Sequence, residues 1–136
     1  MQDPLAKLPG YALRRAANAM MADLSARLAA LDLRIAEASV LMLVETRYDM
    51  TSSEIGRMLD IKRANMVPLL GRLESAGMIE RLPIDRKSQA IILTAAGLDK
   101  LAEVKFITMQ FETDLLMRIP AEHREHFVPA LKALWS

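Results

Sequence analysis

Apolar side chains recur at intervals of three and four residues along most of this chain, which is the spacing of one face of a helix. The pattern predicts six helices, over about residues 9–31, 35–46, 51–59, 62–76, 94–117 and 121–135. Between the fourth and fifth helices, two short apolar runs flank a charged segment, which indicates a two-stranded hairpin over residues 78–82 and 90–93. The chain is therefore expected to be mainly α with a small β wing.

A few polar residues and one glycine mark where the central elements begin and end. Thr51 stands at the start of the third helix and Glu54 lies three residues after Thr51, which is the pattern of a capping box. Gly77 follows the fourth helix, where glycine readily takes the left-handed conformation, and Thr94 is placed to cap the fifth. Helix, tight turn, helix and a hairpin with a basic tip form a winged helix-turn-helix, which places its second helix in the DNA major groove.

Pro68 falls in the first half of the fourth helix. A proline there removes a backbone donor and clashes with the carbonyl four residues earlier, at a cost of about 3 kcal/mol in an ideal helix. One interpretation is that the helix begins late, with Asn65 as its N-cap. The interpretation that we favour is a bent or tightened first turn with a continuous axis, which would re-aim nearby side chains at base edges. The third is that Pro68 is simply tolerated.

Positive charge is concentrated in the predicted reading helix and hairpin. Residues 62–87 carry six cations and three anions (6 − 3 = +3), whereas residues 31–61 carry three cations and six anions (3 − 6 = −3), in a chain whose total is +1. A positive segment of this kind is the electrostatic footprint of a DNA-binding surface. The predicted DNA-binding residues are Ser52, Ser53, Lys62, Arg63, Asn65, Arg86, Lys87 and Ser88.

These side chains suit different contacts. Arg63 can make a bidentate hydrogen bond to guanine and Asn65 one to adenine, while Lys62 is expected to contact a phosphate. Ser52 and Ser53 lie near a helix N-terminus, where they either cap the helix or offer hydroxyls and amides to a phosphate. For each residue the alternative is a solvated surface side chain.

Four motifs carry a resemblance to a known family. They are Arg72-Leu73-Glu74, Gly77-Met78-Ile79-Glu80-Arg81, Asp85-Arg86-Lys87 and Leu93-Thr94-Ala95-Ala96-Gly97. At this spacing they resemble the MarR family of bacterial transcriptional regulators, over the whole chain in length and helix order. The family usually has arginine where this chain has Lys87, so the implied minor-groove contact falls to Arg86, to Lys87 or to both, and lysine lacks arginine's planar fork. Arg72 and Arg81 are alternatively structural, each paired with Glu74 or Glu80.

The resemblance implies a homodimeric, sequence-specific DNA-binding regulator, expected to be a repressor that a small aromatic or anionic effector releases from double-stranded DNA. The effector would bind between the dimer helices and the reading lobe. Its candidate contacts, each equally explained as a core or surface residue, are Tyr11, Arg14, Arg15, Met42, Val44 and Phe106. A two-fold dimer fits a palindromic operator.

Two helices have more apolar surface than one neighbour requires, the first and the fifth, which indicates a second subunit. The expected division is an N-terminal dimerisation helix over residues 1–34, a winged helix-turn-helix DNA-binding lobe over 35–97, and C-terminal dimerisation helices over 98–136. Two alternatives to a ligand-controlled repressor remain open. They are an effector-independent DNA-binding dimer and a winged helix that binds a protein.

Composition excludes several other classes. The chain has no cysteine, which excludes disulfides and thiol redox sensing. No stretch reaches about 18 uncharged apolar residues and the first thirty residues carry charges throughout, so we expect a cytoplasmic protein with no membrane partner. His123 and His126 share a helical face but lack the metalloprotease spacing, and no glycine-rich phosphate loop is present. No enzyme activity, metal or cofactor is expected.

Overall fold

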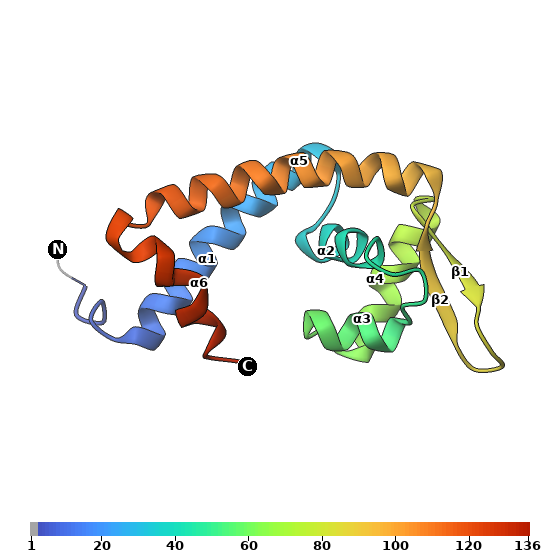
Figure 1. The fold of residues 1–136 in the computed structure, drawn as a ribbon, viewed down its shortest axis with the longest axis horizontal. Coiled ribbons are helices and arrows are strands. Elements are labelled where there is room, and N and C mark those ends of the chain that lie inside the picture. The colour runs from blue at the N-terminus through green and yellow to red at the C-terminus, as the bar shows by residue number, and fades with distance from the viewer. Residues whose placement is uncertain (1–2) are drawn as a thin grey trace.

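The computed structural model describes residues 3–136 and has the predicted class, helical with a two-stranded wing (Figure 1). The elements in order are α1 (Pro9–Leu28), the 3-10 turn η1 (Ala29–Leu31), α2 (Ile35–Val44), α3 (Ser52–Leu59), α4 (Arg63–Ser75), β1 (Ile79–Pro83), β2 (Gln89–Leu93), α5 (Ala95–Arg118), the 3-10 turn η2 (Ala121–His123) and α6 (Arg124–Lys132). In Figure 1, α5 spans the molecule, with α1 and α6 near one end and the winged lobe below the other.

Helix α2 forms the centre of the core, as its apolar sequence predicts. Val40 and Leu41 are fully buried, and the helix packs against α1, α3, α4, α5 and β2. Each such side chain stabilises the fold by about 1.5–3 kcal/mol when it leaves water. Because α2 contacts the two long helices α1 and α5 as well as the winged lobe, it fixes the position of the lobe relative to those two helices.

The turn between α3 and α4 is set by local hydrogen bonds and close packing. The Thr51 hydroxyl accepts the Glu54 N–H and the Glu54 carboxylate accepts the Thr51 N–H, which confirms the capping box. Asp60 ends α3 in the left-handed conformation (φ 55°), and the Ile61 N–H donates to the Gly56 carbonyl across 2.8 Å. These contacts fix the entry of α4.

Helix α4 begins at Arg63 with Lys62 as its N-cap, so the alternative that Asn65 caps a late helix is wrong. The Asn65 N–H donates to the Lys62 carbonyl, which places Asn65 inside the first turn. Pro68 consequently lies within the helix on an exposed side, where its ring is accommodated without burial. Gly77 ends this segment with φ 74°, as predicted for a glycine after a helix.

The two strands of the wing pair antiparallel, with Ile79 opposite Leu93 and Pro83 opposite Gln89. The chain before α3 extends this pairing, because Thr51 forms a bridge with Ala90 and the Ile91 N–H donates to the Met50 carbonyl. The wing is thereby joined to the start of α3, so the hairpin and the helix-turn-helix form one surface.

The base of the wing is fastened to the start of α5. The Thr94 hydroxyl donates to the Gly77 carbonyl and accepts the Gly97 N–H, which confirms Thr94 as a cap. Gly97 packs so closely that an added Cβ would lie 2.0 Å from the Met78 carbonyl oxygen. Only glycine fits at this contact.

Helices α1, α5 and α6 leave much apolar surface exposed. The exposed large apolar residues on and beside these helices are Leu5, Leu8, Leu13, Met21, Leu98, Phe106, Met109, Leu116, Met117, Val128, Leu134 and Trp135. The buried face of α5 contains Leu101, Val104 and Phe111, so this helix has one face in the core and another that is not covered. No helix among residues 3–136 is long and apolar enough to cross a membrane.

Candidate nucleic-acid interface

A surface groove lies between α3, the start of α4 and the wing. It is formed because the α3–α4 turn and the β1–β2 hairpin face each other across the bridge between Thr51 and Ala90. Of the eight predicted DNA-binding residues, those that line this groove are Ser52, Ser53, Lys62, Arg63, Arg86, Lys87 and Ser88. The structure therefore brings together residues that lie up to 36 positions apart (88 − 52) in the sequence.

Asn65 is the predicted residue that the structure does not place in the groove. Its side chain is exposed, but it belongs to a different side of α4 from Arg63 and Val67, which do line the groove. At 100° per residue, two positions along a helix differ by about 200° in direction, which separates Asn65 from Arg63. The predicted adenine contact of Asn65 stays untested.

Charge in the groove is strongly positive. The cations among its lining residues are Arg57, Lys62, Arg63, Arg81, Arg86 and Lys87, and the anions are Asp60 and Asp85. Arg81 is partly neutralised because its Nε donates to the Glu74 carboxylate across 3.3 Å, which confirms the alternative that it pairs to hold the wing. The remaining excess of positive charge suits a phosphate backbone.

Arg57 and Gln89 line this surface but are not among the predicted DNA-binding residues. Arg57 lies on α3, two positions after the buried Ile55 and therefore on an outer face of that helix. This helical position was the signal that could have identified Arg57. Gln89 begins β2, and only the pairing of the strands places it beside α3.

Asp85 shapes the tip of the wing. Its carboxylate accepts hydrogen bonds from the Lys87 N–H at 2.8 Å and the Ser88 N–H at 2.9 Å, and the Ile84 N–H donates to the Ser88 carbonyl. An aspartate that bonds to amides two and three residues later closes a tight turn. The turn leaves the side chains of Arg86 and Lys87 exposed at the rim of the groove.

The N-terminus of α3 carries both serines. Thr51 makes the capping bond, so Ser52 and Ser53 occupy the first turn of α3 and line the groove. Arg47 donates hydrogen bonds to Asp49 and to Glu54, and its bond to Glu54 lowers the pKa of that carboxyl below its usual value. Glu54 is thereby held ionised in the first turn, where a negative charge stabilises a helix.

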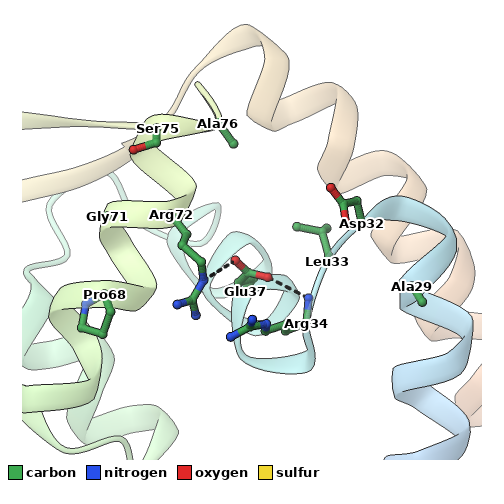
Figure 2. Close-up of a pocket in the computed structure, with 10 residues that line it drawn as sticks. All are labelled: Ala29, Asp32, Leu33, Arg34, Glu37, Pro68, Gly71, Arg72, Ser75 and Ala76. Carbon is green, nitrogen blue, oxygen red and sulfur yellow. Dashed lines mark hydrogen bonds and ion pairs between the residues drawn. The ribbon is translucent and has the colours of Figure 1, made fainter.

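A second hollow lies behind α4, between that helix and the chain that joins α1 to α2 (Figure 2). Figure 2 shows Arg72 and Glu37 pointing toward one another, with Arg34 beside them. Arg72 Nε donates to Glu37 Oε2 across 3.2 Å, and the Arg34 N–H donates to Glu37 Oε1 across 2.8 Å. The expected pairing of Arg72 with Glu74 or Glu80 is therefore wrong, because α4 turns Arg72 toward α2.

The six candidate effector contacts do not share this hollow. Tyr11, Arg14 and Arg15 gather near the start of α1, where both guanidinium groups lie within 5.8 Å of the Tyr11 ring centre and the Tyr11 hydroxyl donates to Asp3. The other three lie on α2 and α5, where Val44 is buried, Met42 packs against the core and Phe106 is exposed. Their role as one effector site stays a prediction.

The histidines at the start of α6 are not part of a wider cluster. Among residues 3–136, no group of three or more histidine, aspartate or glutamate side chains is placed to hold a metal ion. The neighbouring Arg124 has a structural role. Its Nε donates to the carbonyls of Leu116 and Ile119, and Nη2 donates to that of Met117, which satisfies the C-terminus of α5.

Comparisons with known proteins agree with this geometry. The transcriptional repressor CouR, solved bound to a 23-mer DNA duplex, is 31% identical, with a TM-score of 0.89 over 97% of this chain and 95% of that chain. Rv2887 of Mycobacterium tuberculosis, solved with salicylic acid, is 25% identical, with a TM-score of 0.72 over 98% of this chain and 97% of that one.

Curated relatives are more distant. An uncharacterized HTH-type transcriptional regulator of Bacillus subtilis (strain 168), YwoH, is 29% identical over 90 residues, which is 65% of this chain. The chain spans 66% of the length of YwoH and 59% of that of a putative transcriptional regulatory protein for the hcr operon of Thauera aromatica, to which it is 24% identical. The profile described as the MarR family matches residues 33–88, which contain α2, the reading helices and the wing tip. With this match and the 31% identity to CouR over 95% of that chain, the chain belongs to the MarR family of transcriptional regulators.

Proposed function

We propose that this chain is a homodimeric repressor that binds double-stranded DNA through the groove between α3, α4 and the wing. The observation that carries this proposal is the groove itself, which has six cations and two anions on one face. Residues 35–97 form the DNA-binding lobe, residues 1–34 and 98–136 form the dimerisation part, and the activity is binding rather than catalysis. The solved DNA complex of CouR supports the same use of this fold.

The proposed docking follows from the arrangement of the groove. Helix α4 enters the major groove with Arg63 toward base edges, while Lys62 and the first turn of α3 contact phosphates. The exposed wing tip extends toward the neighbouring minor groove, where Arg86 and Lys87 meet its negative potential. Two copies related by a two-fold axis would read half-sites about 34–36 Å apart, which requires a palindromic operator.

The exposed apolar residues of α1, α5 and α6 support the dimer. Phe106 and Met109 are 65% and 71% exposed on the side of α5 that faces away from the core. Contiguous apolar surface of this kind is uncommon on a monomer and marks an interface. The pairing of two such surfaces would hold the two reading lobes at a fixed separation.

The second hollow supports control by a small molecule. It lies between the chain that joins α1 to α2, next to the proposed dimer part, and α4, which reads DNA. Its lining carries two cations, Arg34 and Arg72, and two anions, Asp32 and Glu37, and Arg72 is paired with Glu37. Arg34 is therefore the cation that we expect to contact an anionic effector such as the salicylic acid found with Rv2887. An effector bound there would release DNA only if it bound more tightly to the arrangement that does not fit the operator.

Binding to duplexes selected from a random-sequence library tests the proposal, at two salt concentrations and with full-length protein. Wild type is expected to enrich a palindrome and to bind it with strong salt dependence. An Arg86→Ala, Lys87→Ala variant should bind more weakly, and the slope of log K against log salt should fall by about two. The control variant Lys7→Ala, Lys132→Ala removes equal charge outside the groove and should retain the slope.

Other outcomes would identify a different function. Equal, weak and salt-insensitive binding by all three proteins would contradict a DNA-binding role and favour a winged helix that binds a protein. Tight, salt-dependent binding that no aromatic carboxylate weakens would favour an effector-independent DNA-binding dimer over a ligand-controlled repressor.

A further inference from the structure

One strip along the outward side of α4 has no side chain that can hydrogen-bond to a base. Val67 and Pro68 lie three and four residues after Ala64, and Gly71 lies four and three residues after them, so all four share one side of the helix, and the first three are exposed. The opposite side, with Met66, Leu69, Leu70 and Leu73, is buried in the core. The middle of the solvent-exposed side of α4 is therefore a strip of small or apolar residues, flanked by exposed polar ones such as Arg63 and Asn65.

Within the groove, α4 contributes one exposed apolar side chain, that of Val67. The residues of α4 that line the groove are Arg63, Met66 and Val67, and Met66 is buried. Val67 is 67% exposed and lies one turn after Arg63 on the same side of the helix. An apolar side chain so exposed, on a surface with six cations and two anions, is not explained by packing within the described chain.

The major groove offers one apolar group, the C5-methyl of thymine, which distinguishes A·T pairs at positions where no hydrogen bond is made. We propose that Val67 is a specificity-determining residue that contacts a thymine methyl. Val67 lies one turn of α4 after Arg63, so this thymine would lie close to the base that Arg63 contacts. This inference rests on the proposed function. Ala64, which is exposed and lies three residues before Val67, supports this inference because its small side chain allows α4 to approach the base edges closely.

The test replaces thymine by deoxyuridine, which removes the methyl and leaves every hydrogen-bonding group in place. Duplexes recovered by wild type from a random-sequence library are synthesised with one such replacement per half-site, scanning all thymines, and binding is measured by fluorescence anisotropy. For wild type, one replaced position should weaken binding about fourfold per half-site, the factor that corresponds to one buried methyl group. For Val67→Ala the same position should have little effect.

Two controls separate specificity from folding. Met58→Ala also truncates an exposed apolar side chain, but Met58 does not line the groove, so this variant should discriminate uracil as wild type does. Val67→Thr keeps the shape and one of the two methyl groups, so its discrimination should lie between those of wild type and Val67→Ala, with little change in unfolding temperature because Val67 is exposed.

The outcomes also separate this inference from the proposed function. Tight, salt-dependent binding by wild type with no sensitivity to uracil at any position would overturn the role of Val67 and leave the repressor proposal standing. Sensitivity retained equally by Val67→Ala would assign the methyl contact to another residue and overturn the inference. If no sequence is enriched and binding does not depend on salt, the proposed function fails, and this inference with it.

Discussion

Arg72 Nε donates a hydrogen bond to Glu37 Oε2 across 3.2 Å and thereby joins the reading helix α4 to the central helix α2. Glu37 is only 7% exposed, and its second oxygen accepts the Arg34 N–H at 2.8 Å. A nearly buried carboxylate is thus satisfied from two directions. The pair lies beside the hollow of Figure 2, so the position of α4 and the contents of that hollow are physically linked.

Glu37→Ala should lower the free energy of unfolding by about 1–3 kcal/mol, because it leaves an amide and a guanidinium without their acceptor. Chemical denaturation measures this loss. Glu74→Ala is the matched control, since it removes the partner of Arg81 at an exposed pair and should cost no more than about 1 kcal/mol. Equal losses of unfolding free energy for the two variants would show that the burial of Glu37 does not increase its contribution to stability.

Gly97→Ala should destabilise the protein by about 3 kcal/mol, because the new Cβ would lie 2.0 Å from the Met78 carbonyl oxygen and force the wing away from α5. Gly71→Ala is the control within a helix. Nothing lies within 4 Å of its added Cβ, and alanine should stabilise α4 by about 0.5–1 kcal/mol. Thermal unfolding of both variants distinguishes the close contact from a general effect of glycine, and a stabilising Gly97→Ala would contradict the packing.

Two substitutions of Asp85 separate the effect of its negative charge on DNA binding from the effect of the turn that its carboxylate closes. Asp85→Asn keeps an oxygen that accepts the Lys87 and Ser88 amides and removes a negative charge from the groove, so DNA binding should tighten. Asp85→Ala removes the same charge but also the turn, and binding should weaken. Affinity for the selected duplex decides between them. If both variants bound more tightly to the same extent, Asp85 would act through its charge alone.

The Arg47–Glu54 pair predicts a pH dependence of stability. The hydrogen bond from Arg47 lowers the pKa of Glu54 below 4.5 in the folded state, so the pair stabilises the fold above that value. This contribution is lost as the pH falls through the lowered pKa of the folded state. The advantage of wild type over Glu54→Gln should therefore shrink between about pH 6 and about pH 3.

Denaturation curves at the two pH values test this sign. Glu80→Gln, at an exposed position on β1, provides the comparison, and its difference from wild type should change less over the same interval. A gap between wild type and Glu54→Gln that widened toward acid would contradict the pairing with Arg47.

Local patterns in the sequence were sufficient for the elements and for most of the groove. Capping by Thr51 and Thr94 and the left-handed Gly77 involve groups within a few residues of each other or a glycine's own backbone freedom, so their motifs predict them directly. Lys62, Arg63, Arg86 and Lys87 were identified because charge is concentrated where a reading helix and a wing tip are predicted.

Only the tertiary structure decided the contacts between distant elements. The partner of Arg72 is 35 residues away, and the close approach at Gly97 depends on how the wing meets α5. The exclusion of Asn65 from the groove follows from where α4 begins and how its buried face docks on the core. Helical periodicity gives the relative directions of side chains on one helix, but packing against other elements fixes which direction faces the groove.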